Sequence, residues 1–314
     1  MQAVVIREAQ LHVEDRPDPV PGDTELLVAV RAAGLNAADL VQRSGFYPAP
    51  PGSPPDVPGM ELAGEVVGVG RQVTLFSPGA RVMGVVGGGA QATRACIDEA
   101  HALEVPASLP WPEAGGFPET FSTAYDALFR QAGLQMGERV LISGAAGGVG
   151  TAGVQLAAAA GARVTATVRD PARRHAVAAL GAHAVIAPGE EGDHAPYDVV
   201  LELVGASSVQ AVLPHMAPWS RIVVIGVGGG GTFEIDLMQL MVRKTRIGGS
   251  TLRARSRREK ADVAADVAAH VLPALAAGRI GVPLCDTFSL ADADAAYARF
   301  AAGAKLGKVV LVNE

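Results

Sequence analysis

The first third of the chain carries the hydrophobic pattern of short β-strands separated by turns. Strands are predicted at Val4–Ile6, Leu26–Ala32, Glu65–Val69 and Arg81–Val86, each bounded by turn residues. Between them lies Tyr47–Pro55, which is too rich in proline to form a helix or a central strand. This segment is predicted to be a long loop, and long loops in compact domains often carry function.

The pattern changes near Pro112, where strand-length apolar runs begin to alternate with helical patterns. Strands are predicted at Val140–Ser143, Arg163–Val168, Ala184–Ile186, Asp198–Leu203 and Arg221–Ile225. Helices are predicted within Pro112–Arg130, after its prolines and glycines, and at Val149–Ala160, Pro171–Leu180, Ser207–His215 and Ser256–Ala277, with a last strand at Lys308–Val312. This alternation is typical of the α/β class with a doubly wound parallel sheet.

Val140–Ala162 is uncharged and long enough to suggest a membrane span. Its cluster of glycines would break a spanning helix at its middle. We therefore expect a buried strand, a glycine turn and a buried helix, and no membrane association. The first residues, Met1–Ile6, also lack the pattern of a signal peptide.

Composition excludes several other classes of protein. The 314 residues hold 26 basic and 32 acidic side chains, a net charge of −6, and only 4% aromatics, so we expect no nucleic-acid partner. Cys96 and Cys285 are too few for a disulfide framework or a four-cysteine zinc site, and we expect buried, reduced thiols in a cytoplasmic protein. The arginines between Arg253 and Arg258 are interpreted as a solvated helix start.

A glycine-rich turn follows the predicted strand Val140–Ser143. Its pattern is Ala145-x-Gly147-x-x-Gly150, and it opens a helix, as in dinucleotide-binding folds. Gly147 would let the backbone approach a pyrophosphate, and Gly150 would allow close packing of helix and strand. The candidate cofactor-binding residues of this turn are Ala145, Gly147, Gly148, Val149 and Gly150. The helix N-terminus would supply N–H groups to the phosphates.

The end of the next strand bears on the choice of nucleotide. Val168 stands where an NAD site places an acidic residue for the ribose hydroxyls. Arg169 and Arg173 are suited to clamp a 2′-phosphate, or alternatively form a solvated helix face. Asp170 is interpreted as a helix cap. We therefore expect NADP (NADPH) as the cofactor rather than NAD.

Several motifs together resemble the medium-chain dehydrogenase/reductases. They are Ala33–Asp39, Pro58–Gly70, the glycine turn and Gly307–Leu311, in the order and spacing of that family. The resemblance implies a Rossmann domain plus a GroES-like β domain built from both ends of the chain. It places the first part of the catalytic domain at residues 1–117, the NADP-binding domain at 118–260 and the return at 261–314.

The zinc enzymes of this superfamily carry a cysteine where this chain has Asn36, and a histidine where it has Met60. No cysteine-rich lobe is present either, so no metal is expected. Leu35–Pro48 and Gly249–Ser256 resemble the zinc-free quinone oxidoreductase branch, which includes the zeta-crystallins. Without a metal, an acceptor that takes hydride easily is favoured, such as a quinone or an activated alkene.

Two residues are candidates for catalysis. Tyr47 would donate a proton to the reduced product, or else pack to anchor its loop. Asn36 would orient the substrate or the nicotinamide ribose, or else stabilise a turn, whereas Asp39 is expected to cap or pair rather than catalyse. By resemblance and by position at strand ends, further cofactor-binding candidates are Thr123, Val204, Gly205, Gly226, Val227, Ser250 and Leu252. Lys308 would reach a phosphate or remain solvated.

The function these residues favour is a zinc-independent NADPH:quinone oxidoreductase working in a cleft between two domains. An NADPH-dependent enoyl or alkenal reductase is the alternative, and a non-enzymatic NADPH-binding protein of the crystallin kind a third. Arg246–Leu252 is predicted to include an edge strand of the parallel sheet, and exposed edges invite pairing. A homodimer through that edge is therefore expected.

Overall fold

The computed structural model describes residues 1–313, which form two compact units. One, called here the β-rich unit, contains Met1–Ser122, Leu252–Gly303 and the chain from Lys308. The other, the parallel-sheet unit, contains Thr123–Thr251 and the short segment Ala304–Gly307. The chain therefore passes between the units four times, and each unit is described on its own below.

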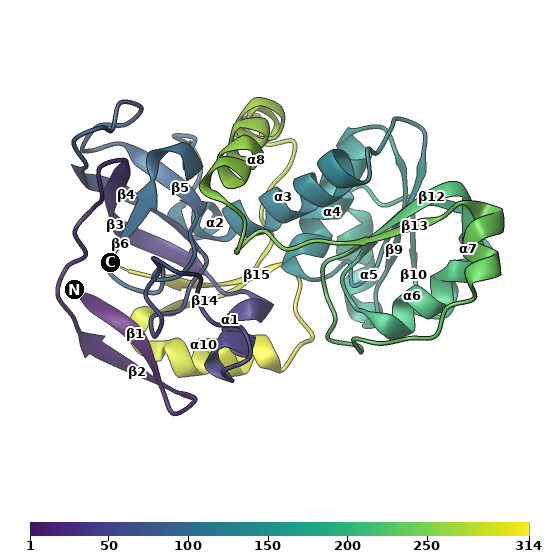
Figure 1. The fold of residues 1–314 in the computed structure, drawn as a ribbon, viewed down its shortest axis with the longest axis horizontal. Coiled ribbons are helices and arrows are strands. Elements are labelled where there is room, and N and C mark those ends of the chain that lie inside the picture. The colour runs from purple at the N-terminus through teal and green to yellow at the C-terminus, as the bar shows by residue number, and fades with distance from the viewer. Residues whose placement is uncertain (314) are drawn as a thin grey trace. The chain divides into compact units, whose positions relative to one another are not determined.

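The β-rich unit is built on a seven-stranded sheet of order β14-β15-β3-β4-β5-β7, with β6 paired to β3 (Figure 1). The strands are β3 Glu25–Gly34, β4 Glu61–Val69, β5 Arg81–Val85, β6 Arg94–Asp98, β7 Ala102–Glu104, β14 Leu284–Ser289 and β15 Lys308–Val312. A separate hairpin joins β1 Gln2–Arg7 to β2 Gln10–Asp15. The core beside the seven-stranded sheet includes Leu26, Leu62 and Ile97, each 2% exposed or less.

The helices of the β-rich unit are shorter than the sequence predicts, because proline and glycine interrupt them. They are α1 Ala37–Arg43, α2 Trp111–Gly116, α8 Arg257–His270, α9 Leu272–Ala276 and α10 Ala293–Ala301, with 3₁₀ turns at Glu99–His101 and Leu290–Asp292. The predicted single helix Ser256–Ala277 is wrong, since it breaks at Val271. Pro273 lacks the N–H that a continuous helix needs there.

The segment Pro112–Arg130 is helical after its prolines and glycines, as predicted, but it is not one continuous element. It divides into α2, then α3 Pro118–Tyr125, then a π-helical turn at Asp126–Gln131. Gly115 and Gly116 precede Pro118, and a proline is favoured at the first position of a new helix. The chain passes from the β-rich unit into the parallel-sheet unit within α3.

The parallel-sheet unit confirms the predicted α/β class. Its six strands run in the order β10-β9-β8-β11-β12-β13, all parallel. They are β8 Arg139–Ile142, β9 Arg163–Thr167, β10 Ala184–Ile186, β11 Tyr197–Glu202, β12 Met216–Val224 and β13 Arg246–Gly249. Helices α4 Gly148–Ala159, α5 Pro171–Ala178, α6 Ala206–Val212 and α7 Leu237–Arg243 pack around them (Figure 1), with 3₁₀ turns at Glu191–His194 and Leu213–His215.

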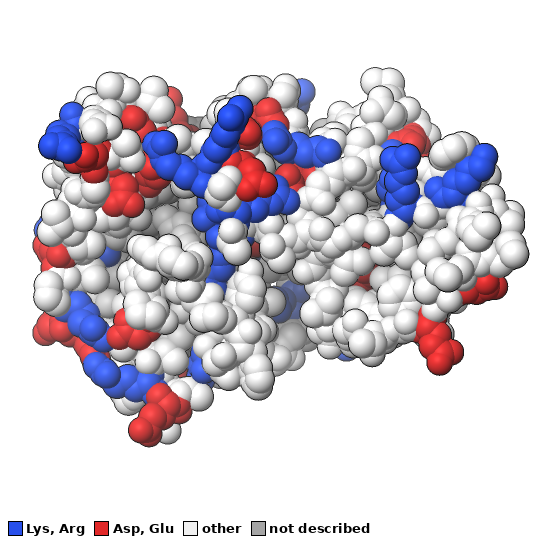
Figure 2. Space-filling model, viewed as in Figure 1, with Lys and Arg blue, Asp and Glu red and all other residues white. Residues whose placement is uncertain are grey.

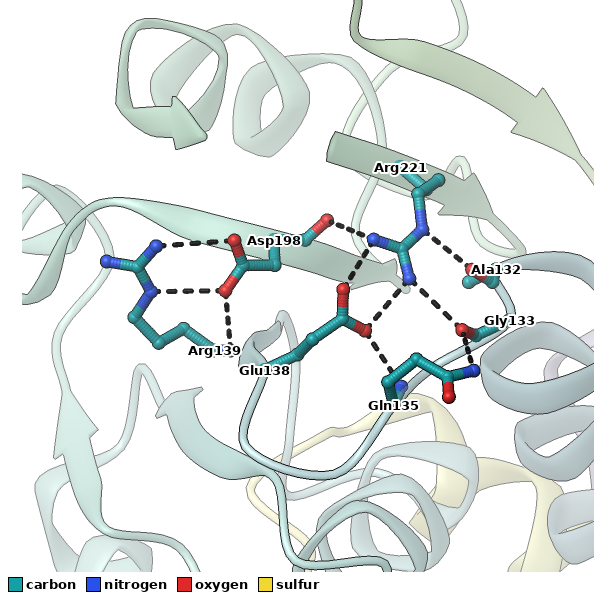
Figure 3. A network of polar contacts seen from close by, with 7 residues as sticks. All are labelled: Ala132, Gly133, Gln135, Glu138, Arg139, Asp198 and Arg221. Atoms are coloured by element: carbon teal, nitrogen blue, oxygen red, sulfur yellow. Dashed lines mark hydrogen bonds and ion pairs between the residues drawn. The ribbon is translucent and has the colours of Figure 1, made fainter. Parts of the chain in front are cut away.

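A polar network joins the amino ends of β8 and β11 to Arg221 of the neighbouring strand β12 (Figure 3). Arg139 at the start of β8 pairs with Asp198 of β11 at 3.1 Å, and Arg221 of β12 pairs with Glu138 at 2.8 Å. Burial acts to raise the pKa of Asp198, but the bonds from Arg139 hold that pKa below its ordinary value. This network lies at the end of the sheet opposite to the carboxyl ends, where ligands of such folds bind.

One edge strand of this sheet is β13, as predicted from the sequence, and the other is β10. Beside it, α7 presents large apolar side chains to solvent, since Leu237, Met238, Met241 and Val242 are between 62% and 71% exposed. Over the part of the chain that the structure describes, no helix has the length and apolar character needed to cross a membrane. Val140–Ala162 forms the predicted strand, turn and helix instead.

Candidate functional site

The glycine turn lies between β8 and α4, and two of its glycines face different surroundings. A Cβ on Gly150 would lie 2.6 Å from both Ala145 Cα and Gly144 O, so close packing of the chain itself requires this glycine. A Cβ on Gly147 would meet only Gly144 O, at 3.5 Å, which is an ordinary contact. Packing therefore leaves space above Gly147, at the residue that caps the N-terminus of α4.

That space adjoins a natural anion site. Gly148 and Val149 open α4, and the first N–H groups of an α-helix have no acceptor within the helix. Ala145 is fully buried beneath the turn. Gly307 N donates to Ala146 O at 2.8 Å, so the returning segment Ala304–Gly307 braces the turn. The arrangement suits a pyrophosphate.

Val204, Gly205, Gly226 and Val227 follow the carboxyl ends of β11 and β12, as the sequence predicts. Gly205 has a φ of +121°, a conformation that favours glycine. A Cβ on Gly226 would overlap Leu203 O. Val227 is 61% exposed and is therefore open to a ligand.

Sequence reasoning missed Glu202, the last residue of β11, which is fully buried. Its Oε1 accepts from Ser143 Oγ at 2.8 Å, Val204 N at 2.7 Å and Gly205 N at 2.8 Å, and its Oε2 accepts from Ser208 Oγ at 2.8 Å. Glu202 thus fixes the loop that carries two cofactor candidates. The available signal was an acidic residue ending an otherwise apolar strand.

The two arginines after β9 differ in the structure. Arg169 is exposed, whereas Arg173 lies 3.5 Å from Asp170 and donates to Ala304 O at 3.0 Å. Asp170 caps α5 through Ala172 N at 3.0 Å, which confirms the predicted cap. Val168 is buried at 2% exposure and offers no acceptor to a ribose. Of these two guanidinium side chains, that of Arg169 is the more exposed.

Thr123, Ser250 and Leu252 lie where the chain passes between the units. Thr123 is buried at 7% exposure on α3. The Ser250 hydroxyl accepts a hydrogen bond from Gln131 Nε2, and Ser250 N donates to Val224 O at 3.0 Å. The structure thus gives Ser250 a role in anchoring the chain after β13.

In the β-rich unit, Asn36 belongs to a buried charged cluster rather than to an open surface. Lys308 Nζ lies 2.6 Å from Glu61 Oε1 and donates to Asn36 Oδ1 and Leu35 O, each at 2.7 Å. Asn36 Nδ2 donates to Glu61 Oε1 at 2.9 Å and to Gly34 O at 3.3 Å. Both of the alternatives considered for Lys308 are wrong, because its side chain is buried and its three protons are all used within the protein.

Asp39 caps α1, as predicted. Its carboxylate accepts from Asn36 N at 2.8 Å and from Gly59 N at 3.1 Å. Burial raises the pKa of Asp39 to about 6, against the opposing effects of the Asn36 N–H and the Lys308 ammonium. The side chain therefore connects α1 to the segment that leads into β4.

Tyr47 begins the proline-rich loop and is half-buried. The guanidinium of Arg253 lies over its ring, with Cζ 5.1 Å from the ring centroid. Arg253 is only 4% exposed, so its interpretation as a solvated residue is wrong. Helix α8 begins four residues later, at Arg257, and the Ser256 hydroxyl accepts from Glu259 N to cap it.

Comparisons with known proteins agree with this arrangement. The family model of the alcohol dehydrogenase GroES-like domain matches residues 22–132, and that of the zinc-binding dehydrogenases matches residues 148–269. The chain is 34% identical to the quinone oxidoreductase-like protein 2 homolog of Nematostella vectensis, over 76% of this chain and 68% of that protein. These matches decide the family.

This chain is a medium-chain dehydrogenase/reductase of the quinone oxidoreductase branch. A solved quinone oxidoreductase from Thermus thermophilus, described with its NADPH complex, shares 31% identity at a TM-score of 0.87, with both chains fully covered. The chain also matches 13% of the spectinabilin polyketide synthase system protein NorB of Streptomyces orinoci, at 34% identity over 91% of its own length. The reductase fold is thus confirmed, with a GroES-like domain and a Rossmann-like parallel sheet.

The name of one matched model mentions zinc, but the residues at the expected ligand positions of this reductase are not zinc ligands. Asn36 is bonded to Lys308, and Met60 is buried at 5% exposure. Within residues 1–313, no three His, Cys, Asp or Glu side chains are grouped so that they could hold a metal ion. Both cysteines are unbridged and half-buried rather than fully buried.

Proposed function

We propose that this oxidoreductase uses NADPH to reduce quinones without zinc. The observation that carries the proposal is the glycine turn, where packing explains Gly150 but leaves open space above Gly147. Exposed Arg169, with Val168 in place of an acidic residue, favours the 2′-phosphate of NADPH over NADH. Its similarity to proteins named as quinone oxidoreductases supports a quinone acceptor.

Bound NADPH supplies a hydride, which carries two electrons and one proton. The protein's own contribution begins with Gly147 and the N-terminus of α4, which hold the pyrophosphate, and with Arg169, which holds the 2′-phosphate. Reduction of a quinone to a hydroquinone needs one further proton at the quinone oxygen. Tyr47 is proposed to donate that proton, since its hydroxyl makes no hydrogen bond within residues 1–313.

Zinc independence is proposed from the charged Lys308 side chain that contacts Asn36. A metal ion there would meet the Lys308 ammonium, which is 2.7 Å from Asn36 Oδ1. Two cations held by the same buried oxygen would repel each other strongly. The Lys308 ammonium therefore occupies the side of Asn36 that a metal would need.

The second candidate function is reduction of an activated double bond in an enone or an enoyl thioester. The similarity to a polyketide synthase protein favours it, and Tyr47 would then protonate carbon rather than oxygen. NADPH oxidation measured with naphthoquinones, enones and enoyl thioesters distinguishes the two. Higher kcat/KM with quinones supports the proposal, turnover of enoyl thioesters alone overturns it, and no turnover with any acceptor indicates a non-enzymatic NADPH-binding protein.

We also propose a homodimer paired through β13. The strand has one unpaired edge in the six-stranded sheet, and the exposed apolar side chains of α7 lie in the same unit. Pairing about a two-fold axis would cover both edges. On the face shown in Figure 2, basic and acidic side chains are intermixed, which does not favour a nucleic-acid partner.

A further inference from the structure

Arg253 is a buried guanidinium without a carboxylate partner. It is 4% exposed, and in the described part of the chain no acidic side chain lies within ion-pair distance of it. Burial lowers the pKa of Arg253, and the more distant Asp39 partly offsets this. A buried charge without a counter-ion costs free energy unless hydrogen bonds compensate for its lost hydration. The groups that accept hydrogen bonds from Arg253 therefore show which part of the structure this charge holds in place.

The acceptors of Arg253 all surround the proline-rich loop. Its Nη1 donates to Tyr47 O at 3.1 Å, its Nε to Gly87 O at 2.7 Å and its Nη2 to Gln42 Oε1 at 2.6 Å. The same guanidinium covers the Tyr47 ring, 5.1 Å from the centroid. Backbone and ring of Tyr47 are thus held by one side chain.

Gln42 extends this hold to the other end of the loop. While its Oε1 accepts from Arg253, its Nε2 donates to Pro55 O at 3.4 Å. Gln42 is itself 5% exposed and lies on α1. Arg253 and Gln42 together therefore fix both the first and the last residue of Tyr47–Pro55.

The middle of the loop packs against three consecutive glycines, Gly87–Gly89. A Cβ on Gly87 would overlap Ser53 Oγ and lie 2.8 Å from Pro50 Cγ, and a Cβ on Gly89 would lie 3.1 Å from Pro54 Cγ. The backbone of Gly87–Gly89 therefore lies so close to the loop that a larger residue at Gly87 would clash with it. Arg253 bonds to the carbonyl of Gly87, at the start of that contact.

We propose that Arg253, through Gln42, is a positioning residue that holds Tyr47 in one orientation for proton delivery to the substrate. Arg253 itself does not touch the reacting atoms. The inference rests on the proposed function, because it assigns to Tyr47 the donor role given above. Its structural part, a Tyr47 ring fixed by Arg253, stands independently of any activity.

The test compares Arg253→Met, Arg253→Lys, Gln42→Met and Tyr47→Phe, with Arg258→Met as the matched control. Arg258 is exposed in the same segment, so its variant removes one charge without touching the loop. We expect Arg253→Met to lower kcat about tenfold or more with little change in the KM for NADPH, and Arg253→Lys to recover part of it. In the Tyr47→Phe background, Arg253→Met should change kcat by less than about twofold, because both act through one group.

A second measurement is independent of activity. Nitration of Tyr47 by tetranitromethane, followed by peptide mass spectrometry, should be faster in Arg253→Met and Gln42→Met than in the control. Unchanged nitration in both variants overturns the positioning role. The role is also overturned if Arg253→Met lowers kcat in the Tyr47→Phe background by the same factor as in the wild type. The proposed function fails if the wild type reduces no acceptor or if Tyr47→Phe retains full kcat. If nitration is nevertheless faster in Arg253→Met and Gln42→Met, the conclusion that Arg253 fixes the Tyr47 ring still holds.

Discussion

Lys308 and Glu61 form a closed ion pair inside the β-rich unit, with Nζ 2.6 Å from Oε1 and neither side chain more than 3% exposed. The remaining oxygen of Glu61 accepts from Glu119 N at 2.9 Å. A Cβ on Gly34 would overlap Glu61 Oε1, so glycine at this position makes room for the pair. The pair joins the starts of β4 and β15 to the end of β3.

Removing one member of this pair should destabilise the protein strongly. Lys308→Met leaves the Glu61 carboxylate buried without its counter-ion, which typically costs about 3–5 kcal/mol. The double variant Lys308→Met, Glu61→Gln should recover part of that loss. Urea unfolding of the three proteins measures the effect, and a single variant as stable as the wild type would contradict it.

No bound metal is expected. Because Asn36 is bonded to Lys308 and Met60 is buried, elemental analysis should find far less than one zinc per chain. Chelators should leave NADPH oxidation unchanged. One tightly held zinc per chain would refute this prediction.

Cofactor selectivity should depend on Arg169. Since this residue is exposed and contacts no acidic side chain within the described chain, Arg169→Ala should weaken NADPH binding by about 10- to 100-fold, equivalent to roughly 1.5–3 kcal/mol. Binding of NADH should change little. Calorimetric titration of both nucleotides checks this, and equal wild-type affinities for the two would contradict it.

The stability contributed by Asp39 should fall as the pH rises from about 4 to about 6. Burial raises the pKa of this carboxyl to about 6 from its ordinary value of 3.8. The folded state therefore holds a proton that the unfolded state releases in this range, a difference of roughly 3 kcal/mol. Unfolding curves across this range should show the slope in the wild type and a smaller one in Asp39→Asn.

Assembly should depend on β13. Ile247→Pro removes a backbone donor from the edge strand Arg246–Gly249, so it should shift the proposed dimer toward the monomer. Light scattering would measure this, with Arg258→Met as a surface control. A wild-type mass near 32 kDa at micromolar concentration would count against the dimer.

The sequence by itself determined the parallel-sheet class, the position of the glycine turn, the Asp170 cap and the edge strand β13. These features follow from local patterns, because strand and helix periodicities and turn chemistry act over a few residues. The helical pattern over Ser256–Ala277 did not reveal the break at Val271, where the missing N–H of Pro273 ends the continuous helix.

Only the tertiary structure decided the surroundings of the charged residues. Lys308 meets Asn36, Arg253 meets Gln42, and Glu202 meets Ser143, across 272, 211 and 59 positions of the chain respectively. No local pattern specifies such partners. Arg253 was therefore expected to be solvated, Lys308 to reach a phosphate or be solvated, and Glu202 went unnoticed. A charged side chain is buried where folding brings enough hydrogen-bond partners to one point, and that depends on the whole fold.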